Sequence, residues 1–481
     1  MHIAVASPRA ILHLTASRAV SMAAQRVGGH RKLRAITLLA GVIALDGADK
    51  GTVSATASDI KQTFHVGNTQ IGVLLTVVSI VSAVLTVPMG VLTDRISRTR
   101  LLAISIVGWA VAVLVSGMAT SFIWLLLSQL GLAAVAAAAG PAVASLTGDL
   151  FPPDERGAVY GQILVGELIG TGLGLVGSTF ITGILGWRWA FWWLVPPTLF
   201  LAWVVHRMPE PERERFEGSD EPQAERDDAL RQAIEGSDVE PRPEMVLHSS
   251  PADMKLWSAV RYVLRIPTNR VLIAASALGY FFFAGLRGFA IAFAQDHYGL
   301  SKTDSSGLML VVGAGAVAGA FFGGRLADRL IDRGVIAGRV WVPAVALLTV
   351  PVMIGPALWA TQVVIALPLL VIGAAMLSAA NPAQDAARLD IVHPRLWGRS
   401  ESIRTLARTA LEASAPLLFG YTSERLLGGD GPGLQATFLI FLVALPAAGA
   451  MGLAALRTYP RDVATAQASI DRLDGDDGQS D

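Results

Sequence analysis

The chain contains no cysteine, and this absence excludes both a disulfide framework and a thiolate metal site. Charge is also scarce, because only 16% of the 481 residues are Asp, Glu, Lys or Arg, whereas 53% are hydrophobic. No phosphate-binding loop is found between a strand and a helix, since Gly-rich stretches such as GTGLG lie inside apolar runs. We therefore expect no enzyme activity, no cofactor, no bound metal and no nucleic-acid partner.

Long apolar runs dominate the sequence. A helix needs about 20 residues to cross about 30 Å of hydrocarbon, and runs of this length recur along nearly the whole chain. We predict an all-α membrane protein with about twelve membrane-spanning helices. The predicted spans are residues 33–57, 69–92, 100–119, 121–148, 156–184, 187–207, 271–295, 303–328, 338–360, 362–391, 396–427 and 432–458.

The cations are unevenly distributed, although the formal net charge is zero. Most arginines fall at the chain ends or in alternate loops, so the positive-inside rule places both termini in the cytoplasm and the protein in the cell membrane. The segment at residues 208–268 is rich in Pro and Glu, so we expect it to be a linker that is helical in parts at most. The predicted regions are a basic N-terminal extension without a signal peptide (1–30), a six-helix bundle (31–207), a cytoplasmic linker (208–268), a second six-helix bundle (269–458) and a cytoplasmic tail (459–481).

Two similar charged segments follow the second span of each half, GVLTDRISRTR at residues 90–100 and GGRLADRLIDRG at residues 323–334. This repetition indicates an internal duplication, and transporters with such repeats commonly bind substrate between them. In each segment a Gly permits close helix approach, an Asp can accept from a helix N-terminus, and Arg side chains can pair with acids of the facing bundle. Loop charges alone would explain the arginines but not the repeated spacing. We predict a cytoplasmic gate of Gly90, Asp94, Arg95, Arg98, Asp328 and Arg329.

Charged side chains inside the predicted spans cost at least about 2.5–3.5 kcal/mol each, so we treat them as candidate site residues. A carboxyl group in apolar surroundings holds a proton more readily than one in water, unless a cation approaches it. Such groups suit proton coupling. The candidates for proton coupling or the substrate cavity are Asp46, Asp49, Lys50, Glu167, Arg287, Asn381, Asp385, Arg408 and Glu412.

The candidates of the N-terminal half also have structural interpretations. Asp49 and Lys50 point about 100° apart on a helix, which favours separate partners over a mutual ion pair. Either could simply hold the first span to a neighbour. Glu167 stands among Gly166, Gly170 and Gly174, whose spacing of four is first a packing device that permits close backbone approach.

In the C-terminal half, Arg408 and Glu412 share one face of the eleventh span. A buried pair between them would be either structural or part of the transport pathway. Arg404 on the same face could extend to the cytoplasm. Arg287 stands alone in the seventh span, where it could meet an anionic ligand, a carboxylate across a cavity or the outer headgroups.

The first charged segment resembles the loop signature of the major facilitator superfamily, Gly-x-x-x-Asp-Arg-x-Gly-Arg-Arg/Lys, with Ser97 and Thr99 as departures. Within that superfamily, three stretches are similar to the Spinster family of lysolipid and sphingolipid transporters. They are ALDGADKGTVSATASDI at 44–60, GTGLGLVGS at 170–178 and HPRLWGRSESIRTLARTALEASAPLLFGYTSERL at 393–426.

This resemblance implies a major facilitator fold and a monomeric secondary transporter that works by alternating access. It also implies an amphipathic lipid cargo such as a lysophospholipid. From the residues themselves we expect proton coupling through Asp49, Glu167 or Glu412. The fourth span departs from the family, because Gln129 and Ala136 stand where the family carries Arg and Glu. Two other transport functions stay open, efflux of hydrophobic small molecules and uptake of an organic anion. A non-transporting receptor or scaffold is the alternative of another class.

Overall fold

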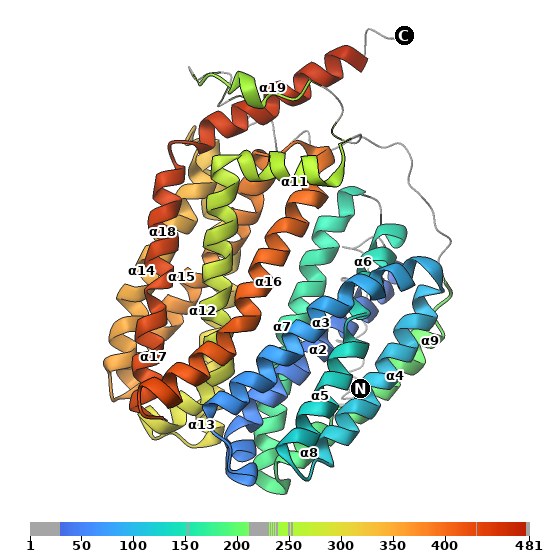
Figure 1. Cartoon of the computed structure of the whole chain (residues 1–481), viewed down its shortest axis with the longest axis vertical. Coiled ribbons are helices and arrows are strands. Elements are labelled where there is room, and N and C mark those ends of the chain that lie inside the picture. The colour runs from blue at the N-terminus through green and yellow to red at the C-terminus, as the bar shows by residue number, and fades with distance from the viewer. Residues whose placement is uncertain are drawn as a thin grey trace, which may run out of the picture. The chain divides into compact units, whose positions relative to one another are not determined.

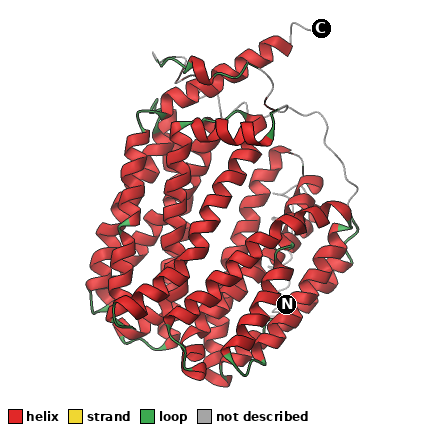
Figure 2. Cartoon of the chain, viewed as in Figure 1, coloured by secondary structure: helices red, strands yellow, loops and turns green. Residues whose placement is uncertain are grey.

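The computed structural model describes residues 29–151, 153–210, 239–248, 254–429 and 431–477, together with positions 230, 232, 234, 236 and 251. Helices make up most of this part of the chain, and Figure 2 shows no strand in it. The described chain therefore has the predicted all-α class. The predicted basic extension lies almost wholly outside the described residues, as does much of the first half of the linker.

The helices before the linker follow the predicted spans (Figure 1). In chain order they are α2 (His30–Phe64), α3 (Asn68–Arg95), α4 (Arg98–Gly117), α5 (Phe122–Ala136), α6 (Ala139–Leu150), α7 (Pro153–Leu185), α8 (Trp187–Trp192) and α9 (Val195–His206). Two of them begin at serine caps, where Ser97 accepts from the backbone N of Arg100 and Ser121 accepts from that of Trp124. Each serine satisfies a backbone donor that the first helical turn leaves unpaired.

The helices after the linker repeat this order of spans and add α11 and α19. They are α11 (Leu256–Arg265), α12 (Pro267–Tyr298), α13 (Lys302–Asp332), α14 (Gly338–Trp359), α15 (Val363–Asp390), α16 (Trp397–Tyr421), α17 (Pro432–Leu442), α18 (Ala444–Ala455) and α19 (Tyr459–Asp477). Short 3₁₀ turns occur at Pro243–Met245 and Pro394–Leu396, and a π-helical turn occurs at Thr422–Leu426.

Three of the predicted spans consist of two shorter helices each, α5 with α6, α8 with α9, and α17 with α18. In every case the break lies close to the fourth residue before a proline, namely Pro141, Pro196 or Pro446. Proline has no N–H to donate and its ring clashes with the carbonyl four residues earlier, so a continuous helix is disfavoured there. The interrupted pairs still run the length of one span.

Ten helical segments of the described chain are long and apolar enough to cross a membrane. The predicted first and eleventh spans, α2 and α16, are not among them, although each is long enough. Both carry several charged side chains, and it is these two helices that contribute to the polar clusters described below. Their polarity is thus linked to the candidate site.

The chain divides into two compact units, Met1–Thr56 with Val81–Asp220 and Ala57–Ile80 with Glu221–Asp481. This division differs from the regions expected from sequence, because residues 57–80 belong to the second unit. They form the end of α2 and the beginning of α3. The first unit has an apolar core between α2, α4, α6, α7 and α9, with Leu39 and Leu146 almost fully buried.

The described residues of the second half of the linker (230, 232, 234, 236, 239–248, 251 and 254–268) pack with α19 in a layer that we call the linker cap. Leu247 N donates to Ser469 Oγ (3.1 Å), and Thr268 N donates to Asp462 Oδ2 (3.0 Å). Tyr459 and Val463 of α19 are buried in this layer together with other apolar side chains. Figure 1 shows α11 lying across the ends of α12 and α16. Apolar side chains of the described linker residues thus pack against α19.

Candidate functional site

Helices α2 and α7 are in backbone contact along a glycine ridge. A Cβ added at Gly170 or Gly174 would overlap the carbonyl oxygen of Ala44 or Ala48 on α2. These glycines are therefore required by the close approach, as the sequence analysis predicts. The contact brings the polar residues of α2 against Glu167, which lies one residue after Gly166 on the same ridge.

Lys50 on α2 lies between two carboxylates of the first unit. Its Nζ donates to Asp46, one helical turn earlier, and lies 3.7 Å from Glu167 Oε1. The side chains of Lys50, Asp46 and Glu167 are each about one-third exposed. Thus Lys50 does not pair with the adjacent Asp49, as the helical geometry predicts.

Asp49 points into the first unit. It is buried beside Gln129, and its Oδ1 has no hydrogen-bond partner in the part of the chain that the structure describes. The Gln129 amide, on α5, donates to Ser116 Oγ on α4 (3.3 Å), which fixes its orientation. Asp49 is thus a buried carboxyl group next to a cluster of two acids and one cation.

The second unit holds the polar residues of α12, α15 and α16. Arg287 Nη2 lies 3.5 Å from Glu412 Oε1, so the partner of Arg287 is a carboxylate within the same unit. Arg408 lies with its guanidinium 4.5 Å from the ring centroid of Tyr280. The expected pair of Arg408 with Glu412 is wrong, because Arg287 holds that carboxylate and Tyr280 offers its π-face to Arg408.

A second group of charges lies toward the beginning of α16. Arg404 contacts Asp385 Oδ1 (2.7 Å) and Glu401 Oε1 (2.8 Å), while Arg388 contacts Glu401 Oε2 (2.7 Å). Arg404 and Arg388 are both buried. The expectation that Arg404 extends to the cytoplasm is wrong, because two carboxylates hold it inside the unit.

The two guanidinium groups and two carboxylates of this group balance by themselves, but Arg408 lies close enough to act on Asp385. With Arg408 included, three guanidinium groups stand against the two carboxylates of Asp385 and Glu401. In the described chain, Arg388 Nε and Nη1 and Arg408 Nε are buried without a hydrogen-bond partner. Donors left in this way are suited to an anionic ligand. The remaining candidate on α15, Asn381, is half-buried one turn before Asp385.

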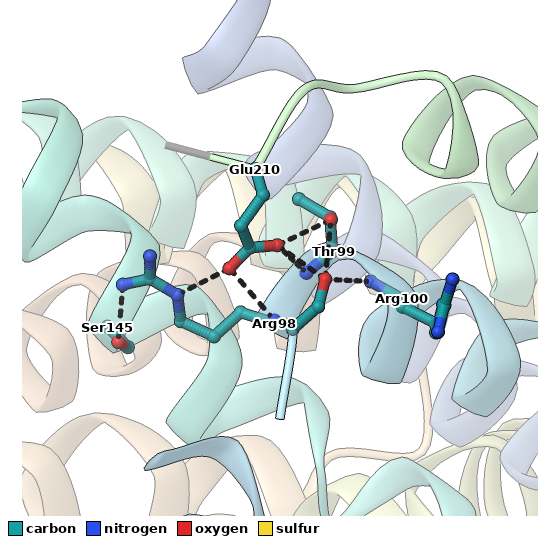
Figure 3. A network of polar contacts seen from close by, with 6 residues as sticks. Arg98, Thr99, Arg100, Ser145 and Glu210 are labelled. Carbon is teal, nitrogen blue, oxygen red and sulfur yellow. Dashed lines mark hydrogen bonds and ion pairs between the residues drawn. The ribbon is translucent and has the colours of Figure 1, made fainter. Parts of the chain in front are cut away.

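The first charged segment is organised around a residue that the sequence analysis missed. Arg98 is buried, and its Nε donates to Glu210 Oε1 (2.9 Å) and its Nη1 to Ser145 (3.2 Å). Glu210 also accepts from the backbone N of Arg98 and Thr99 and from the hydroxyls of Ser97 and Thr99 (Figure 3). We expected Arg98 to pair with an acid of the facing bundle. Its partner instead lies in the same unit, just after α9.

Burial opposes ionisation of Glu210, but the hydrogen bonds from Thr99, Arg98 and Ser97 outweigh it and lower the pKa of this carboxyl to about 2. Glu210 is therefore ionised at neutral pH and sits at the N-terminus of α4, where a negative charge is stabilised. A signal for it exists in the sequence, since it is an acid placed directly after a span and opposite a basic segment.

The other predicted gate residues of this segment are less constrained. Arg95 is exposed, and the side chain of Asp94 is not among the described ones. A Cβ at Gly90 would lie 3.9 Å from Pro141, which is ordinary contact. Close helix approach therefore does not require Gly90, in contrast to Gly323 of the second segment, where a Cβ would overlap backbone atoms of α15.

In the second segment, Asp328 Oδ1 accepts from Arg339 Nη2 (3.2 Å) at the start of α14. Arg339 also donates to Asp390, which accepts from the hydroxyl of Tyr459 as well. Asp328 therefore pairs within its own unit, not with a neighbouring helix N-terminus as expected. Arg329 is exposed. Asp390, the buried centre of this group, was not among the predicted residues.

A further set of contacts, also missed from sequence, joins residues 57–80 to the rest of the second unit. Lys302 donates to Asp59, and Asn68 Nδ2 donates to Ser423 Oγ (3.0 Å). The backbone N of Thr69 donates to Glu424 Oε2 (2.7 Å). These contacts connect the α2–α3 turn to the beginning of α13 and to the π-helical turn after α16. Their partners are more than 200 residues apart, so no local pattern indicates them.

No group of three or more His, Asp or Glu side chains in the described chain is arranged to hold a metal ion. The clusters above are built from carboxylates and guanidinium or ammonium groups. Such groups can exchange protons and can bind charged organic groups.

The sequence of the chain matches a known protein family. A model of the Major Facilitator Superfamily matches residues 39–387. Protein spinster homolog 1 of Xenopus tropicalis is 30% identical over 145 residues, which cover 30% of this chain and 28% of that protein. The Mus musculus protein of the same name is 31% identical over 200 residues, covering 40% and 37%. The chain thus matches well under half the length of either relative.

Solved structures share the fold over nearly the whole chain. A bacterial homologue of the human lysosomal transporter Spinster, inward-facing and unoccupied, has a TM-score of 0.70 at 21% identity and covers 89% of this chain and 98% of its own. The nucleoside transporter NupG has a TM-score of 0.63 at 13% identity, covering 89% of this chain and 98% of its own. At such identities the likeness shows the fold alone. The family match, the repeated spans and the intramembrane charges together show that the chain belongs to the Major Facilitator Superfamily, as a multi-pass membrane transporter similar to the Spinster proteins.

Proposed function

We propose that this protein is a proton-coupled secondary transporter whose cargo is an amphipathic lipid such as a lysophospholipid. The observation that carries the proposal is the position of Lys50 between Asp46 and Glu167, beside the buried Asp49. Two carboxyl groups share one ammonium group, and the third, Asp49, is buried beside them. One carboxyl can therefore take up and release a proton while Lys50 keeps a partner.

Proton binding at this cluster has a mechanical consequence. Glu167 sits on the glycine ridge that joins α7 to α2, so the charge of Glu167 acts directly on the contact between the two helices. A protonated Glu167 no longer attracts Lys50 as an ion, which weakens one link across that contact. Coupling by this route needs no acid in the fourth span, where Ala136 stands.

In this proposal, the anionic headgroup of the cargo binds in the second unit. Its three guanidinium groups, Arg388, Arg404 and Arg408, exceed the two carboxylates near them and retain unpaired buried donors. A phosphate or carboxylate group accepts from such donors in bidentate geometry. Uptake of an organic anion is the second candidate function, because the same donors favour any anionic head. The resemblance to the Spinster family favours a lipid.

In this proposal, the contacts between residues 57–80 and the rest of the second unit form a gate. The ion pair of Lys302 with Asp59 and the bonds of Glu424 and Ser423 must break if the α2–α3 turn is to leave α13 and α16. Alternating access then consists of making and breaking this set in turn with the charged segments at the other end of the spans.

Flux in proteoliposomes tests the function. Purified protein is reconstituted with an imposed pH gradient and supplied with a labelled lysophospholipid, an organic acid, a nucleoside or a hexose in separate experiments. We expect saturable, gradient-dependent movement of the lysophospholipid and none of the hexose. Saturable transport of the organic acid alone would favour the second candidate. Flux of none of these, with tight lysophospholipid binding, would indicate a non-transporting receptor and overturn the proposal.

A further inference from the structure

A groove of about 400 Å³ lies on the surface of the first unit, between α4 and α9. Its floor is made by Ala103 and Ala202, which are buried, and its walls include Ile104, Leu199 and Trp203, which are about half exposed or more. Small side chains between larger ones leave the hollow. The helices pack directly against each other and lie side by side in Figure 1.

The groove faces hydrocarbon in a bilayer. The residues of α4 and α9 that line the groove are apolar except for His206 at the end of α9, as expected for the lipid-facing side of a span. Water is not stable in such a slot because the lining offers it almost no polar partners, and an empty slot would forfeit dispersion contacts on one side. The volume lies within the usual range of small-molecule sites. An acyl chain is the occupant that suits both the surroundings and the shape.

Two arginines stand at one end of the groove. Arg100 lies one turn before Ile104 on the same face of α4. Arg207 directly follows α9, and its guanidinium lies 4.1 Å from the ring centroid of Trp203. Since α4 begins and α9 ends at this level, both cations reach the same end. Figure 3 shows Arg100 pointing away from Glu210, whose carboxylate is engaged by Arg98 and its neighbours.

We propose that this groove is a binding site for one anionic glycerophospholipid of the surrounding bilayer. One acyl chain lies over Ala103 and Ala202, and the phosphate lies against Arg100 and Arg207. Trp203 is placed between the two parts, where an aromatic ring suits the boundary of headgroup and hydrocarbon. The site is independent of transport, since none of its residues belongs to the Lys50 cluster or to the charge group of α15 and α16.

The headgroup preference follows from the two arginines. Each cation near an anionic lipid surface strengthens binding about fivefold. Zwitterionic phosphatidylcholine offers the same chains and a phosphate, but its choline cation opposes the arginines. We therefore expect phosphatidylglycerol to bind more tightly than phosphatidylcholine with identical chains, by at least about fivefold.

Native mass spectrometry of the full chain tests the site. The detergent-purified protein is titrated with phosphatidylglycerol or phosphatidylcholine of identical chains, in the wild type and in an Arg100→Gln, Arg207→Gln double variant. The double variant should lose the preference for phosphatidylglycerol yet still bind both lipids through the groove. Arg325→Gln is the matched control, because Arg325 also lies over an exposed ring, that of Phe321, and should leave the preference unchanged.

A groove-filling variant tests the acyl-chain part. Leu199→Trp places bulk in the slot from an exposed wall position, so folding should be retained, and it should weaken both lipids together. Equal binding of the two lipids by the wild type would overturn the proposal, as would an unchanged preference in the double variant. Displacement of the bound lipid by stoichiometric lysophospholipid would also overturn it, because the groove would then belong to the cargo. Lipid retention is measured without flux, so failure here is distinct from failure of the transport proposal.

Discussion

Glu167 of α7 lies 3.7 Å from Lys50 of α2, across a helix contact that is held at backbone distance by glycines. The charge pair and the glycine ridge occupy the same stretch of both helices. A change in the charge of Glu167 therefore acts on the tightest contact of the first unit.

Replacement of Glu167 by Gln keeps the shape of the side chain and removes its titration. We expect Glu167→Gln to abolish accumulation driven by a pH gradient in proteoliposomes while counterflow exchange persists. Glu244→Gln, an exposed linker acid, is the control and should transport normally. Full accumulation by Glu167→Gln would eliminate Glu167 as the coupling residue and leave Asp46 or Asp49.

The glycine ridge can be tested on a single helix. Gly170→Ala adds a Cβ that would overlap the backbone of α2, so the free energy of unfolding in mixed detergent should fall by roughly 1–3 kcal/mol. Gly183→Ala on the same helix meets nothing within 4 Å and should instead raise stability by about 0.5–1 kcal/mol through helix propensity. Equal effects of the two substitutions would contradict the backbone contact.

Asp390 and Asp328 both pair with Arg339, but they differ in burial. We therefore expect their substitutions to change the free energy of unfolding by different amounts. The Asp390 side chain is 4% exposed and that of Asp328 is 60% exposed. Asp390→Asn leaves a largely buried guanidinium short of its main partner and should cost about 3–5 kcal/mol of unfolding free energy. Asp328→Asn should cost less than about 1 kcal/mol. A larger effect at Asp328 would restore it as the main anchor of the second charged segment.

The contribution of Glu210 to the stability of the folded protein should depend on pH. Its pKa in the folded protein, about 2, lies below the ordinary value of 4.5, so its stabilising effect is complete above pH 4.5 and is lost as pH falls toward 2. The difference in melting temperature between wild type and Glu210→Gln should therefore be constant above pH 4.5 and shrink below it. Glu240→Gln, another exposed acid, should show no such difference.

Hydrogen exchange measures the same contact locally. Without the carboxylate, the amides of Arg98 and Thr99 lose their acceptor, at a cost typical of a helix cap, roughly 0.5–2 kcal/mol. Their exchange in Glu210→Ala should accelerate by a factor of about 2 to 30. Unchanged exchange would mean that another group supplies the cap.

The fold could be predicted from sequence because its signals are local. The apolar runs locate the spans, the two charged segments indicate the duplication, and the spacing of Gly166, Gly170 and Gly174 indicates the α2–α7 contact. The helices α11 and α19 were not predicted, and neither were the proline breaks inside three spans, although Pro141 and its counterparts are visible in the sequence.

Ionic partners could not be predicted in the same way. Arg98 and Glu210 are 112 residues apart, and although the place of Glu210 directly after a span is visible in the sequence, the sequence does not show which arginine of the basic segment it pairs with. The pairing of Arg408 with Glu412 looked favourable because of helical spacing, yet Arg287 from another helix reaches the carboxylate. The ionic partner of a long side chain depends on which helices pack together in the folded protein. Helical periodicity in the sequence indicates only which face of a helix the side chain occupies.

The linker cap has a consequence for the order of events during synthesis. Leu247 bonds to Ser469, which the ribosome adds 222 residues later. At bacterial to eukaryotic elongation rates this delay is roughly 10–45 s, during which the cap residues of the linker have no α19 to cover them. The last helix to emerge therefore completes a layer begun before the C-terminal spans were inserted. A nascent chain arrested before Tyr459 would expose that apolar surface to chaperones and proteases.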